Sequence, residues 1–172
     1  MKYLDIEEKA YSLLKKNSEH LKNDFEVDVY KIASNLSIVI HEKSLSNEIS
    51  GLLIIKDGKV VIGVDSDQGI QRKRFTIAHE LGHYYLHRQF KSTFVDEVFA
   101  RSGSSNQVER EANAFAAALL MPKELIIKAI KVNNWQTIDD DEILSLAKKF
   151  NVSGVSMTYR LVNLNIIDQP DF

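Results

Sequence analysis

The chain has 172 residues, of which 44% are hydrophobic and 27% are charged, with 22 Lys and Arg against 24 Asp and Glu. This length suits one domain with a sizeable core, and the near-neutral charge gives no electrostatic reason to expect nucleic acid as the main partner. The absence of cysteine excludes disulfides and thiolate metal sites. No apolar run approaches the ~18 residues of a membrane span and no signal peptide is visible, so we expect a soluble cytoplasmic protein.

The N-terminal third predicts two helices followed by strands. Apolar residues recur at helical spacing over residues 2–22 and 28–36, and the β-branched run LSIVIHE at 36–42 favours a strand. The segment GLLIIKDGKVVIGV places two apolar runs around Asp57-Gly58, a dipeptide typical of a type I′ turn. We therefore expect a β-hairpin at residues 52–64.

The rest of the chain is predominantly helical in pattern. Expected helices cover residues 74–87, 108–121, 123–132, 139–150 and 153–164, and a long loop at 89–107 contains one short strand in TFVDEVF. The predicted fold class is α+β, a small antiparallel sheet with helices packed mainly on one side. We expect a single domain over 1–172, with the sheet and a pair of site helices in 1–122 and a helical C-terminal subdomain in 123–172.

The segment RFTIAHELGHYYLH contains the pattern H-E-x-x-H. On a helix, His79 and His83 lie on one face about 6 Å apart along the axis, so both imidazoles can bind one metal ion. Glu80 is placed to hold and deprotonate a water molecule at that metal. A glycine inside a helix costs about 1 kcal/mol, so Gly82 indicates that another part of the chain approaches closely.

His87 belongs to the same stripe but lies about 12 Å beyond His79 along a straight helix. Metal–nitrogen bonds are about 2 Å long, so one ion cannot easily bind His79, His83 and His87 together. We therefore expect His87 to pack or to support a ligating histidine.

A catalytic zinc site of this kind needs a third protein ligand. The candidates are His20, His41, His87 and the carboxylates. Glu109 and Glu111 lie about 200° apart on the predicted helix VEREANAFAA, so they cannot both face one site. Glu109 shares its face with small residues and is the preferred ligand, Glu111 is the alternative, and both could instead be solvated. Asn113 can hydrogen-bond the far nitrogen of a ligating histidine.

The segment LAKKFNVSGVSMTYRL has the rhythm of a helix-turn-helix, which is typical of DNA-binding proteins. Its second helix has only Arg160 as a basic residue, too few for the usual phosphate contacts, so a packing or substrate-docking role is preferred. For stabilising an oxyanion the candidates are Tyr84, Tyr85, Tyr159 and Arg160, although packing or surface roles are favoured for each.

Taken together, residues 27 to 167 resemble the ImmA/IrrE family of zinc metallopeptidases. The resemblance rests on GLLIIKDGKVVIGVDSDQGIQRKRFTIAHELGHYYLH, on VEREANAFAAALLMP and on LAKKFNVSGVSMTYRLVNL. It implies a compact zincin-like metallopeptidase domain with a helical C-terminal part. It also implies zinc bound by His79, His83 and a glutamate of the EREAN segment, with Glu80 as general base. Asn113 stands where glutamate-type zincins have an aspartate.

Family members cleave helix-turn-helix repressors of mobile elements and stress responses, so the resemblance implies a regulatory protein as substrate. The alternative function is a non-catalytic protein-binding module on the same fold. The strand VVIGV is a candidate for the edge of the sheet, where an extended substrate segment could pair with it. A plain core strand is the equal alternative.

Overall fold

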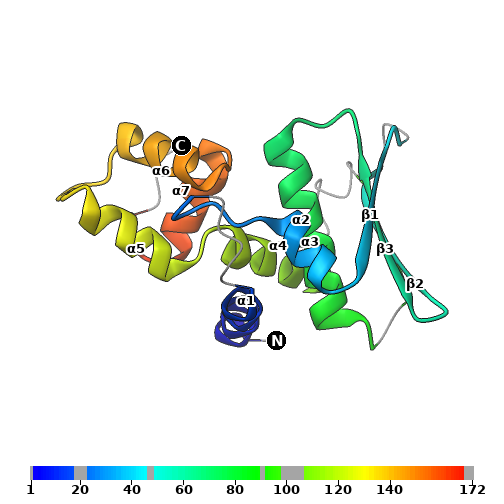
Figure 1. Ribbon diagram of the computed structural model, residues 1–172. Helices are drawn as coiled ribbons and strands as arrows, with labels where there is room; N and C mark the ends of the chain where they lie inside the picture. Colours follow the sequence, from blue (N-terminus) through cyan, green and yellow to red (C-terminus); the bar gives the residue numbers. More distant parts are fainter. Residues whose placement is uncertain (1, 18–22, 46–48, 90–91, 98–106, 169–172) are drawn as a thin grey trace.

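The computed structural model describes residues 2–17, 23–45, 49–89, 92–97 and 107–168. Figure 1 shows a sheet at one end, helices α5 to α7 at the other, and α3 and α4 between them. Along the chain the elements are α1 (Tyr3–Lys16), α2 (Val29–Asn35), β1 (Ile38–Lys43), β2 (Ile49–Lys56), β3 (Lys59–Asp65), α3 (Ile70–His87), β4 (Thr93–Glu97), α4 (Gln107–Leu120), α5 (Lys123–Val132), α6 (Asp140–Phe150) and α7 (Gly154–Asn163). This is the α+β fold class that the sequence predicts.

The four strands form one sheet in the order β1-β3-β2-β4. The predicted hairpin joins β2 to β3, and its turn residues Asp57 and Gly58 have positive φ of 50° and 73°, as a type I′ turn requires. The expectation of a purely antiparallel sheet needs correction, since β1 runs parallel to β3. The chain enters β2 at the end of the sheet where β1 finishes, so β2 runs antiparallel to β1. The hairpin then brings β3 back between them, which makes β3 parallel to β1.

The same topology settles the place of VVIGV. This segment lies in β3, which is paired with β1 on one side and with β2 on the other. Its backbone is therefore hydrogen-bonded to a strand on each side. VVIGV is a core strand and not an edge for a substrate strand. The edges of the sheet are β1 and β4.

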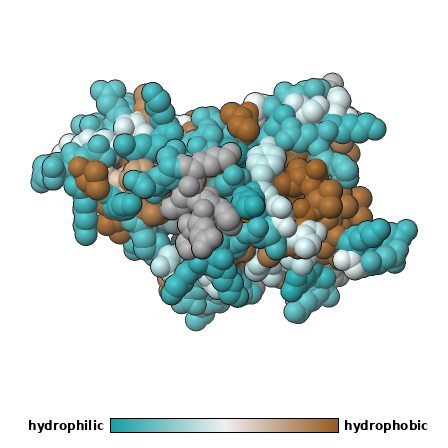
Figure 2. Space-filling model, in the orientation of Figure 1, coloured by the Kyte–Doolittle hydropathy of each residue, from teal (hydrophilic) through white to brown (hydrophobic). Residues whose placement is uncertain are grey.

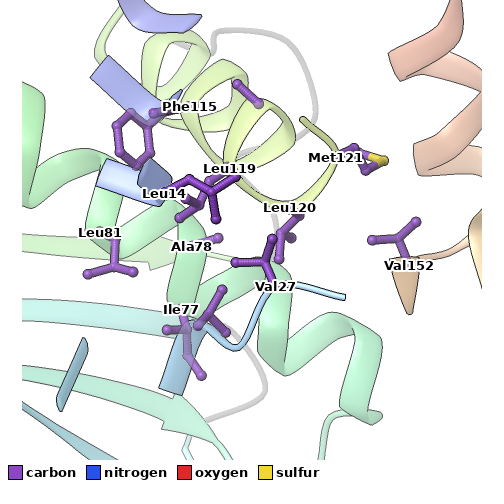
Figure 3. Close-up of a cluster of buried hydrophobic side chains, with 14 of the residues drawn as sticks. Leu14, Val27, Ile77, Ala78, Leu81, Phe115, Leu119, Leu120, Met121 and Val152 are labelled. Atoms are coloured by element: carbon purple, nitrogen blue, oxygen red, sulfur yellow. The ribbon is translucent and has the colours of Figure 1, made fainter. Parts of the chain in front are cut away.

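Helix α3 packs against one face of the sheet, α4 packs against α3, and α1 packs against α4. Figure 3 shows Leu14 of α1, Leu81 of α3 and Phe115 and Leu119 of α4 in this core. The buried cluster continues into the C-terminal helices, where it includes Met157. The single domain over 1–172 and its division at residue 122 both stay predictions.

The opposite face of the sheet carries exposed apolar residues. Val39 of β1 and Ile54 of β2 are exposed and both lie opposite Val61 of β3, so the three side chains share that face. Figure 2 shows hydrophobic residues gathered at the sheet end of the molecule. Among the described residues, no helix is long and apolar enough to cross a membrane.

The helix limits agree with the sequence prediction to within a few residues, except at the end of α1 and the start of α3. Helix α1 ends at Lys16 with Asn17 as its cap, and the predicted continuation over 18–22 lies outside the described residues. Helix α3 begins at Ile70, four residues before the predicted start. The predicted strand in the 89–107 segment is β4, and residues 98–106 lie outside the described part.

The predicted helix-turn-helix rhythm corresponds to α6 and α7. Asn151 between them is left-handed with φ 52°, and the Ser153 hydroxyl accepts a hydrogen bond from the Ser156 N–H at the start of α7. Arg160, the basic residue of α7, is only 1% exposed and forms an ion pair with Glu7 of α1. It therefore cannot contact DNA phosphates, which favours the packing role.

Candidate metal centre

Helix α3 brings the H-E-x-x-H residues into the interior. His79, Glu80 and His83 are 2%, 0% and 1% exposed. A Cβ on Gly82 would lie 3.1 Å from the Ala112 carbonyl oxygen, so this glycine allows the backbone of α4 to approach α3, as the sequence predicted. The close approach places the first turn of α4 over the two histidines.

Glu109 in that first turn faces the histidine pair. Its Oε2 lies 3.2 Å from His79 Nε2 and its Oε1 lies 3.5 Å from His83 Nε2. The two Nε2 atoms are 2.9 Å apart. The structure therefore brings together the three residues that the sequence favoured as metal ligands, one from α4 and two from α3.

Glu111, the alternative third ligand, lies elsewhere. Its Oε2 is 3.1 Å from Nε2 of His87, and the Nδ1 of His87 is in turn 3.1 Å from the Nδ1 of His83. His87 is 4% exposed. It therefore contacts the far side of His83, which is the supporting position that the sequence predicted.

The far side of His79 is also engaged. Its Nδ1 lies 3.0 Å from Oδ1 of Asn113, one turn after Glu109 on α4. This is the contact that the sequence suggested for Asn113. Both histidines thus point Nε2 towards Glu109 and Nδ1 towards a polar side chain.

The protonation states suit a cation. Burial lowers the pKa of His83 below its ordinary value, which favours the neutral imidazole that a metal needs. Hydrogen bonding with His79 is the largest influence that holds the pKa of the Glu109 carboxyl well below its usual range. The site therefore offers neutral nitrogen and charged oxygen at neutral pH.

The donor set also fits a metal in its dimensions. One ligand atom from each of His79, His83 and Glu109 lies within 4.8 Å of the others, so these residues could hold a metal ion. Tetrahedral bonds of about 2 Å place neighbouring ligand atoms roughly 3.3 Å apart, which falls inside the range of 2.9 to 3.5 Å found among these three.

Other candidates for metal ligation do not join this group. His41 is exposed on β1, and His20 lies outside the described residues. Among the candidates for stabilising an oxyanion, Arg160 is paired with Glu7, Tyr85 stacks on Phe115 with ring centres 5.8 Å apart, and Tyr84 lies under the Arg88 guanidinium. Those three are engaged in packing.

Tyr159 is different because it is 63% exposed and lines a cavity beside the site. The cavity measures about 340 Å³ and also borders Phe75 and Asn113. Asn113 contacts Nδ1 of His79, so this hollow between α3, α4 and α7 lies on the side of His79 that faces away from Glu109.

Two supporting residues were not found from the sequence. A Cβ on Gly51 of β2 would meet Thr76 at 2.3 Å and Glu80 Oε1 at 3.1 Å, so Gly51 makes room for α3 on the sheet. Phe94 of β4 stacks on the His83 ring, with ring centres 4.4 Å apart and planes 18° apart. Neither could be assigned without knowing which strand lies beside the helix.

Comparison with known proteins agrees with this arrangement. Residues 33–162 match the family model described as the IrrE N-terminal-like domain, a peptidase family. The chain belongs to this family. The match spans both site helices and most of the C-terminal part, consistent with an α+β metallopeptidase domain of the zincin-like type.

Two curated relatives resemble this member of the IrrE N-terminal-like family. Metallopeptidase ImmA of Bacillus subtilis (strain 168) is 28% identical over 134 residues, which cover 78% of this chain and 75% of the relative. An uncharacterized immunity region protein 2 of Bacillus phage phi105 is 29% identical over 138 residues, covering 78% and 84%.

Proposed function

We propose that this chain is a zinc-dependent endopeptidase that cleaves a regulatory protein. The observation that supports this most is the combination of His79, His83 and Glu109 around one point with Glu80 beside them on α3. A purely structural metal site has no use for an additional buried glutamate next to its ligands. The proposal assigns one zinc per chain to His79, His83 and Glu109, with Glu80 as the catalytic residue.

When bound, the zinc would polarise the scissile carbonyl and increase the acidity of a water molecule. Glu80 would accept a proton from the water as its oxygen attacks the carbonyl carbon, and would then deliver that proton to the leaving nitrogen as the C–N bond breaks. His87 and Asn113 would keep the two ligating rings oriented. The buried position of Glu80 keeps bulk water away from the carboxylate.

We infer that the substrate is a helix-turn-helix repressor of a mobile element or stress response in the cytoplasm. The phage phi105 relative is an immunity region protein, which supports a regulator as target. The edge strand β4 lies beside His83 through Phe94, and an extended peptide can pair with such an edge.

The test is incubation of the zinc-loaded protein with purified repressors encoded near its gene, followed by mass spectrometry of the products. The matched control is Glu80→Gln, which should retain zinc while cleavage falls about 100-fold to 10,000-fold. A single cleavage site, lost in Glu80→Gln, supports the proposal. If the wild type binds the repressor without cutting it, or if Glu80→Gln works equally well, the chain is a binding module and not a peptidase.

A further inference from the structure

A line of polar side chains leads away from the metal-facing side of His83. From Nδ1 of His83 the line passes to Nδ1 of His87 at 3.1 Å, and from Nε2 of His87 to Oε2 of Glu111 at 3.1 Å. His83 and His87 are 1% and 4% exposed, and the side chain of Glu111 is 12% exposed. These contacts join α3 to α4 one turn beyond the candidate metal ligands.

The chemistry of the end member fixes the direction of every hydrogen bond in this line. An ionised carboxylate can only accept, so Nε2 of His87 must donate to Glu111. A neutral His87 then has its lone pair on Nδ1, which can only accept. Nδ1 of His83 must therefore be the donor, and a neutral His83 is left with a bare Nε2, which can accept from the Nε2–H of His79 at 2.9 Å in the metal-free protein.

We propose that Glu111 and His87 are positioning residues that hold His83 in the Nδ1–H tautomer, with its Nε2 lone pair presented to a metal ion before the ion arrives. This rests on the proposed metal site and adds to it two residues that touch neither metal nor substrate. The Phe94 ring stacked on His83 keeps the imidazole plane fixed, so the ring cannot easily turn away from His87.

On the side away from Glu109, the second ligating histidine has no equivalent constraint. His79 contacts Asn113, whose amide can present either its oxygen or its NH₂ group to Nδ1. Asn113 therefore accommodates both tautomers of His79. The relay through His87 to an acceptor-only carboxylate fixes the tautomer of His83 from its far side, which would not follow if His87 merely filled space.

The direct test is the tautomer of His83 in the metal-free protein at pH 8, above the ordinary imidazole pKa of about 6.5. Long-range ¹H–¹⁵N spectra of the ¹⁵N-histidine-labelled protein distinguish Nδ1–H from Nε2–H. The variants are His87→Phe, which removes the acceptor, and Glu111→Ala, which removes the group that orients His87. Arg110→Ala, a neighbouring charge on the same helix, is the matched control.

We expect the Nδ1–H tautomer for His83 in the wild type and Arg110→Ala, and a mixture with Nε2–H in Glu111→Ala and His87→Phe. Zinc affinity, measured against a competing chelator, should fall about 10-fold to 100-fold in the last two. His87→Asn has an amide oxygen that can accept in place of Nδ1, so its zinc affinity should be close to that of the wild type. His87→Phe fills the space of the ring but offers no acceptor, so its zinc affinity should stay low.

An Nε2–H tautomer for His83 in the wild type overturns the proposal, and so does unchanged zinc affinity in both His87→Phe and Glu111→Ala. If either variant fails to fold by circular dichroism, the wild-type tautomer alone decides. The tautomer is read without metal or substrate, so a wild type that shows Nδ1–H but cleaves nothing would disprove the peptidase and leave the positioning role intact.

Discussion

The carbonyl oxygen of Ala112 on α4 lies 3.1 Å from where a Cβ on Gly82 of α3 would stand. The Cα of Ala112 and the Cβ of Phe115 would each be 3.2 Å from the same point. Because part of this contact is with backbone, it cannot be relieved by rotation of a side chain. The separation of the two helices, and with it the distance from Glu109 to the histidines, depends on the absence of a side chain at Gly82.

Gly82→Ala is therefore expected to push α4 away from α3. Crowding of a packed interior costs about 1–3 kcal/mol, against a gain of at most about 1 kcal/mol from the helix propensity of alanine. We expect lower stability in urea unfolding together with weaker zinc binding. Gly154→Ala is the matched control, because there the close neighbour is the flexible side-chain end of Leu144. Equal behaviour of the two variants would contradict the close-packing argument.

The two glutamates of α4 should differ in their effect on metal content. At saturating zinc, Glu109→Ala should lose stoichiometric binding because its carboxylate lies 3.2 Å from His79 Nε2. Glu111→Ala should still take up about one zinc per chain, although more weakly, because Glu111 reaches His87 and not the ligand atoms. Elemental analysis after dialysis gives the answer, and loss of zinc only in Glu111→Ala would exchange the two assignments.

Acid should destabilise the metal-free protein. The folded-state pKa of His83 lies below the ordinary value of 6.5, because burial disfavours the charged ring. Its contribution to stability is therefore fully present above about pH 6.5 and is lost as the pH falls towards the folded-state value. The depressed pKa of Glu109 acts in the same direction at lower pH.

The check is the free energy of unfolding in urea with a chelator present, measured from pH 8 to pH 5. His83→Asn should reduce the loss of stability on acidification. His41→Asn, at a histidine that is exposed on β1, is the matched control. A wild-type stability that rises on acidification over this range would show that the sign is wrong.

Arg160 should matter for stability more than for chemistry. Its guanidinium donates to the Met121 carbonyl, the Tyr3 hydroxyl and the Glu7 carboxylate, and so ties α7 to α1 and to the end of α4. Arg160→Met removes these hydrogen bonds and leaves the partly buried Glu7 carboxylate without its ion-pair partner. We expect the free energy of unfolding to fall by about 2–3 kcal/mol.

Urea unfolding of Arg160→Met should show this loss, while Lys131→Met at the end of α5 should lie close to the wild type. Adding Glu7→Gln to Arg160→Met should recover part of the stability, because it removes the charge left without its partner. Full wild-type stability of Arg160→Met would mean that these bonds contribute nothing net to the folded state.

Local pattern was sufficient for much of the fold. Helical periodicity predicted α5 over residues 123–132, and Asp57-Gly58 predicted the turn of the hairpin, because these features depend on a few neighbouring residues. The spacing of His79, Glu80 and His83 likewise follows from helix geometry. The positions of β1 and β3 in the sheet did not follow, because strand order depends on contacts far apart in the chain.

The sequence by itself determined the residue types available for a metal and the face of α3 on which two of them lie. Only the tertiary structure shows that Glu109, and not Glu111, faces the histidine pair, because both are on α4 and its rotation depends on the packing of Ala112 against Gly82. It also joined His87 to Glu111, a contact across two helices that no local spacing encodes. Helix periodicity fixes which side chains share a face, whereas the partner of that face is fixed by burial of surface from distant parts of the chain.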